Sequence, residues 1–131
     1  MSIRVFLVED TRHMQGVLHD LLNVVGTASF EIVATRTTEA EANLWLDEHP
    51  GGWDLALVDL ILEQGTGMGV IPRARKAAPG APVVVLSDYA TPGIRQHCIK
   101  LGADAVFQKS QDMQAFIDYC ASLVDREPAG V

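Results

Sequence analysis

Five short apolar runs, each followed by a segment with helical spacing, restrict the fold of this chain more than any other feature of its sequence. Three of the runs contain the uninterrupted apolar stretches VFLV, LALV and VVVL, which are typical of parallel strands buried on both faces. Strands that alternate with helices indicate βαβ units, whose right-handed crossovers place helices on both faces of one sheet. The sequence therefore predicts an α/β fold, a three-layer (βα)5 sandwich around a five-stranded parallel sheet. The predicted strands are Ile3–Val8, Phe30–Thr35, Leu55–Val58, Pro82–Leu86 and Ala105–Phe107.

The expected helices carry start and stop signals. An apolar stripe with helical spacing runs from Met14 to Val25, and Gly26 is the expected stop of the first helix. Thr38, with Glu41 three residues later, forms a capping-box pattern at the start of the second helix. These signals place the first two helices directly after the first two strands.

The remaining helices are marked by proline, glycine and hydroxyl residues. The third helix is expected over Gly69–Ala78, where Pro72 is tolerated only within the first turn. Thr91 as N-cap before a proline predicts the start of the fourth helix, and Gly102 its end. Ser110 is the expected N-cap of the last helix.

Composition excludes several classes of protein. The 131 residues are 48% hydrophobic and carry a net charge of −7, which supports one globular domain and argues against disorder or wrapping of nucleic acid. No apolar run approaches the roughly 20 residues of a membrane span. Cys98 and Cys120 lack metal or redox spacing and are expected to be buried thiols of a cytoplasmic protein. The basic cluster Arg73–Lys76 is expected to be a solvated helix face. Residues 1–125 are expected to form one domain, and residues 126–131 a flexible tail.

Polar side chains follow the predicted strands at the edge of the sheet where sites of such folds lie. Glu9 and Asp10 follow the first strand, Asp59 the third, Ser87 the fourth, and Lys109 comes just after the fifth. Three clustered carboxylates repel one another, and a divalent cation such as Mg²⁺ relieves that repulsion. A carboxylate beside such a cation can attack phosphorus, and a lysine and a hydroxyl can stabilise the phosphoryl group during transfer. We expect these side chains to converge within roughly 8 Å.

With these residues in view, the chain resembles the receiver domains of bacterial two-component response regulators, of the CheY-like superfamily. The resemblance extends from Ile3 to about Val124 and is carried by the segments FLVED, LVDLILEQGTGMGV, VVVLS and LGADAVFQKS. It implies a flavodoxin-like sheet in the order 2-1-3-4-5. It also implies that Asp59 accepts a phosphoryl group, that Lys109 pairs with the phosphate and that Ser87 donates a hydrogen bond to it. Mg²⁺ would be held by Glu9, Asp10, Asp59 and the backbone carbonyl of Ile61, and Gly65 and Gly67 would shape the loop after Asp59.

The function implied by this resemblance is that of a signalling switch, not an enzyme beyond its own phosphorylation and slow dephosphorylation. The expected partners are a sensor histidine kinase or phosphotransfer protein and an unknown downstream protein, with no membrane or direct nucleic-acid contact, in a monomer or weak dimer. A single-domain response regulator is the leading hypothesis. The alternatives are a receiver module from a longer DNA-binding regulator and a degenerate receiver that acts as an interaction module without phosphorylation.

Several positions depart from the pattern of the family, among them Ser110, where many relatives have proline. Val106 stands where an aromatic residue usually couples to the hydroxyl, so signal transmission is expected to use the loop after the fourth strand and the helix that follows. Asp88 either points to solvent or adds a fourth acid to the site. Ile61 and Tyr89 lack an acid or amide that would orient water, which predicts slow autodephosphorylation. A flavin site is disfavoured because the segment after the first strand, EDTRHM, is acidic and would repel the phosphate of the flavin. A phosphoaspartyl hydrolase is disfavoured because it would need a second acid two residues after the nucleophile, where this chain has Ile61.

Overall fold

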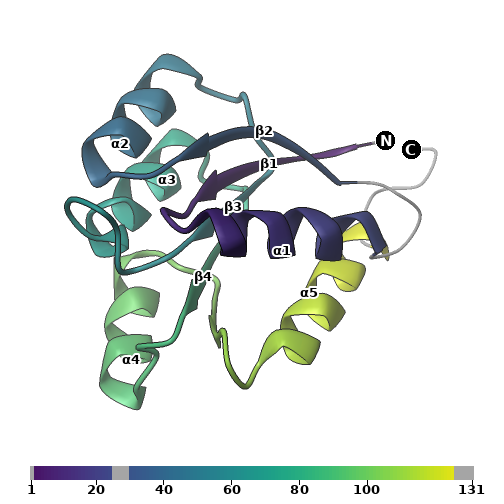
Figure 1. Ribbon diagram of the computed structural model, residues 1–131. Helices are drawn as coiled ribbons and strands as arrows, with labels where there is room; N and C mark the ends of the chain where they lie inside the picture. The colour runs from purple at the N-terminus through teal and green to yellow at the C-terminus, as the bar shows by residue number, and fades with distance from the viewer. Residues whose placement is uncertain (1, 25–29, 126–131) are drawn as a thin grey trace.

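The computed structural model describes residues 2–24 and 30–125, in which strands and helices alternate as predicted (Figure 1). The strands are β1 (Ile3–Val8), β2 (Phe30–Arg36), β3 (Leu55–Val58), β4 (Val83–Ser87) and β5 (Ala105–Gln108). The helices are α1 (Arg12–Val24), α2 (Glu39–Glu48), α3 (Ile71–Ala77), α4 (Pro92–Leu101) and α5 (Met113–Asp125), with a single 3-10 turn, η1, at Gly67–Gly69. The predicted helix stop at Gly26 and the predicted tail over 126–131 lie outside the described residues.

The strands form one parallel sheet in the order β2-β1-β3-β4-β5, which confirms the predicted topology. All four residues of β3 and all five of β4 are buried, because helices cover both faces of these central strands. At the outer edge of the sheet, only the first residue of β2, Phe30, is buried, and the rest of the strand is half-buried or exposed. The continuous apolar runs in the sequence thus correspond to the middle of the sheet.

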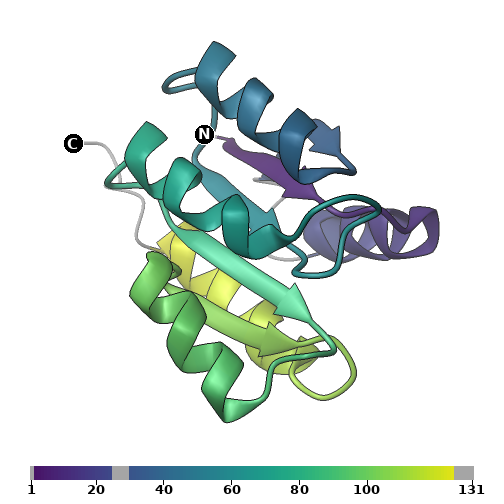
Figure 2. The ribbon, with the colours of Figure 1, turned by 90° about the vertical axis from the view of Figure 1, so that its left-hand side faces the viewer.

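Two helical layers enclose the sheet. Helices α2, α3 and α4 lie on one face and α1 and α5 on the other (Figure 1), and Figure 2 shows the first three in front of the strands. The sheet separates two apolar clusters. One contains Trp45 and Trp53 with residues of α3 and α4, and the other contains Leu18, Leu22 and Phe116 from α1 and α5. Both tryptophans are therefore core residues.

Local signals set the starts of α2 and α4 where the sequence predicts them, whereas α3 begins at Ile71, two residues after the predicted Gly69. Thr38 accepts a hydrogen bond from the backbone N–H of Glu41 at 3.2 Å, and its hydroxyl donates to the Glu41 carboxylate at 3.0 Å. Thr91 caps α4 by accepting from the N–H of Ile94 at 3.3 Å. Gly102 ends that helix with a φ of 123°, in the region that glycine tolerates best.

Two predictions about side chains are wrong. Ser110 lies in a turn, and α5 begins three residues later, after Asp112, whose carboxylate accepts from the N–H of Gln108 at 2.8 Å. Arg75 is not a solvated residue of α3. Its guanidinium donates to the carbonyls of Pro79, Ala81 and Gly102 and also pairs with Asp104, which ties α3 to the loop before β5.

The expectations drawn from composition can also be compared with the fold. Cys98 and Cys120 are buried thiols, as predicted, and burial raises the pKa of Cys120 to about 12. None of the helices in the described part of the chain has both the length and the apolar character that crossing a bilayer requires.

Candidate functional site

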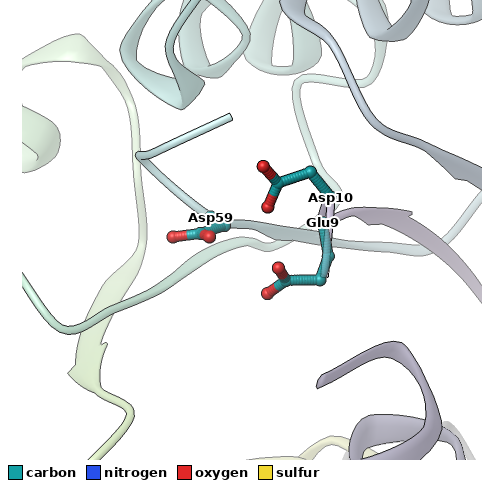
Figure 3. A group of neighbouring side chains, drawn as sticks. All are labelled: Glu9, Asp10 and Asp59. Carbon is teal, nitrogen blue, oxygen red and sulfur yellow. The ribbon is translucent and has the colours of Figure 1, made fainter. Parts of the chain in front are cut away.

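Three carboxylates meet where the central strands end. Glu9 and Asp10 follow β1, and Asp59 follows β3; the last residues of these paired strands, Val8 and Val58, are register partners. One oxygen from each acid lies within 4.8 Å of the oxygens of the other two. Figure 3 shows the three carboxylates gathered around a common space. The predicted convergence within roughly 8 Å is therefore confirmed for these residues.

Lys109 reaches the acids from the end of the edge strand β5. It follows β5, and β4 lies between that strand and β3, so its side chain must pass the end of β4. Its ammonium lies 2.6 Å from Glu9 Oε1 and 3.1 Å from Asp59 Oδ2. Only 11% of the Lys109 side chain is exposed. The lysine thus bridges two carboxylates from different strands.

Backbone and side-chain donors fix the two buried acids. The N–H of Thr11 donates to Glu9 Oε2 at 3.1 Å, and the amide of Gln15 donates to the Glu9 carbonyl at 2.7 Å. The N–H of Ile61 donates to Asp59 Oδ1 at 3.4 Å. Sequence reasoning missed Thr11 and Gln15. Thr11 could have been found as the residue between the acid pair and the start of α1, whereas apolar spacing gives no sign of Gln15.

Ser87 lies at the same edge, but its hydroxyl is engaged elsewhere. The side chain is fully buried, and Oγ accepts a hydrogen bond from the N–H of Tyr89 at 3.1 Å. The Ser87 carbonyl accepts from the N–H of Lys109 at 3.3 Å. The structure thus places Ser87 between the lysine and the β4–α4 loop, with its hydroxyl directed to that loop.

A depression of about 250 Å³ opens beside Asp59. Asp88 lies on its rim with an exposed side chain, so it both faces solvent and borders the site. Ile61 and Tyr89 are 51% and 59% exposed and flank the same opening. His13 is exposed and does not border it. The lining residues are Asp10, Thr11, Asp59, Ile61, Asp88, Tyr89 and Lys109.

Burial and charge act against each other in this cluster. Burial raises the pKa of the Asp59 carboxyl; the Lys109 ammonium lowers it and the Glu9 carboxylate raises it, with a net rise. Burial alone would lower the pKa of Lys109, but its hydrogen bond to Glu9 and the charge of Asp59 outweigh that effect and raise it. Lys109 therefore stays charged, while Asp59 still lacks full compensation for its negative charge.

The donor set fits a small divalent cation. All three side chains offer oxygen, which Mg²⁺ prefers, and oxygens bound to one Mg²⁺ at about 2.1 Å lie no more than about 4.2 Å apart. The observed limit of 4.8 Å needs a closure of only about 0.6 Å. The cluster of Glu9, Asp10 and Asp59 is therefore an acidic triad suited to Mg²⁺.

Val106 and its neighbour Phe107 face opposite sides of the sheet. Val106 is buried on the face of the sheet that α4 covers, whereas Phe107 points to the other face. There its ring packs edge-on against Phe116 and Tyr119, with centroid distances of 5.9 and 5.8 Å. Arg95 of α4 donates to the Val106 carbonyl and pairs with Asp112 at 2.7 Å. Helix α4 is thus tied to β5 by an arginine.

Comparison with known sequences points to one family. The profile described as "Response regulator receiver domain" matches residues 5–121. The transcriptional regulatory protein DesR of Bacillus subtilis is 24% identical over 123 residues, which is 94% of this chain and 59% of DesR. The photosynthetic apparatus regulatory protein RegA of Rhodovulum sulfidophilum is 39% identical over 57 residues, 44% of this chain and 31% of RegA. The chain thus spans about a third to three-fifths of the length of these relatives.

Solved structures share the fold. A chain of the CheX–CheY–BeF3–Mg²⁺ complex from Borrelia burgdorferi gives a TM-score of 0.80 at 18% identity, covering 93% of this chain and 89% of that one. The response regulator domain of CheB from Thermotoga maritima gives 0.79 at 19% identity, covering 98% and 100%. The chain therefore belongs to the response regulator receiver domain family, whose members are signalling modules of two-component systems rather than conventional enzymes.

Proposed function

We propose that this protein is a phosphoacceptor switch in which Asp59 receives a phosphoryl group from the phosphohistidine of a sensor histidine kinase or of a phosphotransfer protein. The observation that carries the proposal is the position of Asp59. Its carboxylate borders an open depression and lies 3.1 Å from the Lys109 ammonium, with Glu9 and Asp10 beside it. An attacking oxygen, a counter-charge and a cation-binding set thus occur together at one surface.

The transfer forms one bond and breaks another. An Asp59 carboxylate oxygen bonds to phosphorus as the bond from phosphorus to the donor nitrogen breaks, and the imidazole leaves with that electron pair and takes up a proton from water. The product is an acyl phosphate. Lys109 pairs with the oxygens of the transferred group, which places its ammonium between the new phosphate and the Glu9 carboxylate.

Glu9, Asp10, Asp59 and the carbonyl of Ile61 would hold Mg²⁺. When bound there, Mg²⁺ neutralises the charge that collects on the phosphoryl oxygens and the carboxylates. Glu9 is only 1% exposed and is fixed by Thr11 and Gln15, so it is preorganised for this role. Asp10, at the rim, remains accessible to a cation that arrives from solvent.

The signal would leave the site through Ser87 and α4. On phosphorylation the Ser87 hydroxyl turns from the Tyr89 N–H toward a phosphate oxygen, which releases the β4–α4 loop. Because α4 is tied to β5 by Arg95, a shift of that loop changes a surface formed by both elements. A downstream protein that prefers one arrangement would then bind with altered affinity. The CheX–CheY complex of the Borrelia protein is an example of a receiver bound to a protein partner.

Intact-mass measurement after incubation with acetyl phosphate and Mg²⁺ tests the proposal. The wild-type chain should gain one phosphoryl group, and Asp59→Asn should gain none. Asp88→Asn is the matched control, because it makes the same change at another acid of the same depression and should still be labelled. A wild-type chain without label would instead favour an interaction module that works without phosphorylation, and label on Asp59→Asn would remove the assignment.

One observation favours a more specific setting for this switch. The relatives DesR and YvfU of Bacillus subtilis are transcriptional regulatory proteins, of which the matched regions cover 59% and 56%. The receiver would then control DNA binding by a further part of the same protein. The mass of the protein isolated from its own cells tests this, since such a regulator would be clearly heavier than 14.2 kDa.

A further inference from the structure

The loop between β3 and α3 wraps around one side chain of α2. The Glu39 carboxylate accepts a hydrogen bond from the N–H of Thr66 at 2.8 Å, and the Glu39 N–H donates to the Gln64 carbonyl at 3.0 Å. A Cβ added at Gly65 would lie 2.5 Å from Glu39 Cβ, and one at Gly69 would lie 2.2 Å from Glu39 Oε2. Glu39 therefore fills a cradle that only glycines leave open.

The other side of the same loop touches the phosphoacceptor. A Cβ at Gly67 would lie 2.0 Å from the carbonyl oxygen of Asp59, and the Gly67 N–H donates to the Leu60 carbonyl at 3.0 Å. Ile61 and Thr66 are antiparallel bridge partners across the loop. Ile61 donates its N–H to the Asp59 carboxylate, and Thr66 donates its N–H to the Glu39 carboxylate. One backbone bridge thus connects the two carboxylates.

An acid in the first turn of a helix has a simpler use, which is to complement the helix dipole. Glu41 satisfies that description, because its carboxylate accepts from Thr38 in the capping box. Glu39 instead contacts a residue 27 positions away, and the loop has glycines where its side chain passes. Its contacts therefore point to the loop and not to its own helix.

We infer that Glu39 is a positioning residue for the phosphoacceptor site, acting as the hydrogen-bond acceptor that holds the loop over 59–70 in the conformation that keeps Ile61 beside Asp59. The inference rests on the proposed function, because it assigns Glu39 a role at the same site. With the loop already ordered, a cation that binds to Asp59 and the Ile61 carbonyl does not have to order it. Without Glu39 that ordering opposes binding and lowers the affinity.

Three variants separate this role from a general effect of charge or stability. Glu39→Ala removes the acceptor, whereas Glu39→Gln keeps an oxygen that can accept from Thr66. Glu48→Ala, at the exposed far end of α2, removes the same charge away from the loop. Gly69→Ala places a methyl group where the Glu39 carboxylate lies. It should therefore displace the hydrogen-bond acceptor of Thr66 while residue 39 remains glutamate.

The first readout needs no metal. Amide hydrogen exchange, resolved by NMR, should be faster at Thr66 by at least about 10-fold in Glu39→Ala, because the hydrogen bond that protects this N–H is lost. Calorimetric titration of Glu39→Ala should then give a Mg²⁺ affinity about 10-fold weaker than that of the wild type. This is the lower end of the losses of about 10- to 100-fold that are typical when a residue that orients a metal ligand is removed. Gly69→Ala should behave like Glu39→Ala, and Glu39→Gln and Glu48→Ala should stay within about 2-fold of wild type.

Unchanged exchange at Thr66 or unchanged Mg²⁺ affinity in Glu39→Ala would overturn the inference. So would a loss in Glu39→Gln as large as that in Glu39→Ala, since charge and not the acceptor would then matter. If Glu39→Ala does not fold, Gly69→Ala and Glu39→Gln still decide the question. Acetyl phosphate labelling of the wild-type chain keeps the two proposals apart: absence of label counts against the phosphoacceptor function, whereas normal label with unchanged Mg²⁺ affinity in the variants counts against Glu39 alone.

Discussion

Replacing Lys109 by methionine tests how the acidic cluster is held together. The ammonium lies 2.6 Å from Glu9 and 3.1 Å from Asp59. With an effective dielectric constant of about 20, these distances correspond to attractions of about 6 and about 5 kcal/mol. Desolvation of the buried ammonium offsets much of that sum, and breaking buried pairs of this kind typically costs about 3–5 kcal/mol. We therefore expect Lys109→Met to lower the free energy of unfolding by about 3–5 kcal/mol in buffer with EDTA.

Mg²⁺ should restore part of that loss, because it binds the carboxylates that the lysine neutralises. At 100 times its dissociation constant, a ligand adds about 2.7 kcal/mol to the stability of the state that binds it. Removal of the lysine leaves these carboxylates without their counter-charge, so Mg²⁺ should stabilise Lys109→Met more than it stabilises the wild type. The measurement is urea unfolding followed by fluorescence of the buried Trp45 and Trp53, with EDTA and with excess Mg²⁺.

Lys100→Met is the matched control, since Lys100 is exposed near the end of α4. Its effect should stay within about 0.5 kcal/mol and should not depend on Mg²⁺. The reasoning would be refuted if Lys109→Met were as stable as Lys100→Met in EDTA. It would also be refuted if Mg²⁺ stabilised the wild type and Lys109→Met equally, because the lysine and the cation would then not share the same carboxylates.

Three further perturbations test other parts of the structure. Gly67→Ala should lower the free energy of unfolding by at least about 2 kcal/mol, because its methyl group would lie 2.0 Å from a backbone oxygen. Gly16→Ala, in open space on α1, should instead raise the free energy of unfolding by about 0.5–1 kcal/mol. Urea unfolding of both variants measures the difference. A hydrogen bond from Arg4 lowers the pKa of Asp54 in the folded protein. The stability that this pair contributes is therefore present above the ordinary pKa of about 3.9 and is lost as the pH falls through the lower pKa of the folded state. Asp54→Asn should therefore cost less than about 1 kcal/mol at neutral pH, since the pair is half exposed, and the difference should disappear in acid-series urea unfolding. The acyl phosphate of the wild type should decay over minutes or longer, and Ile61→Gln should shorten its lifetime by supplying an amide beside Asp59 that can orient water. Release of phosphate measures both lifetimes. Decay of the wild-type acyl phosphate within seconds would contradict the prediction.

Much of the fold could be predicted because its signals are local. The apolar runs of β3 and β4 are buried along their whole length, and Thr38 and Glu41 meet within one helical turn. Since β1 and β3 are parallel neighbours, the acids that follow them had to share an edge. The positions of Asp59 and Glu9 could therefore be predicted from a pattern of strands without any knowledge of their contacts.

Predictions failed where a distant residue decides the local conformation. Ser110 was expected to cap α5, yet the helix begins after Asp112, because Arg95, 17 positions earlier, and the N–H of Gln108 hold that carboxylate. Arg75 was expected to be solvated, yet the approach of the loop before β5 provides carbonyls for its guanidinium. Neither partner can be identified from spacing along the chain.

The sequence by itself determined the elements, the parallel sheet and the strand ends at which the acids and the lysine lie, because hydrophobic periodicity and helix caps act over a few residues. Only the tertiary structure decided that Lys109 bridges Glu9 and Asp59, that the Ser87 hydroxyl faces Tyr89, and that Glu39 supports the loop beside the site. These contacts join residues up to 100 positions apart, and they depend on strand order, register and side-chain direction together. The contacts of Lys109 are set by the packed molecule as a whole, because they exist only after the sheet has brought the ends of β1, β3 and β5 to the same edge.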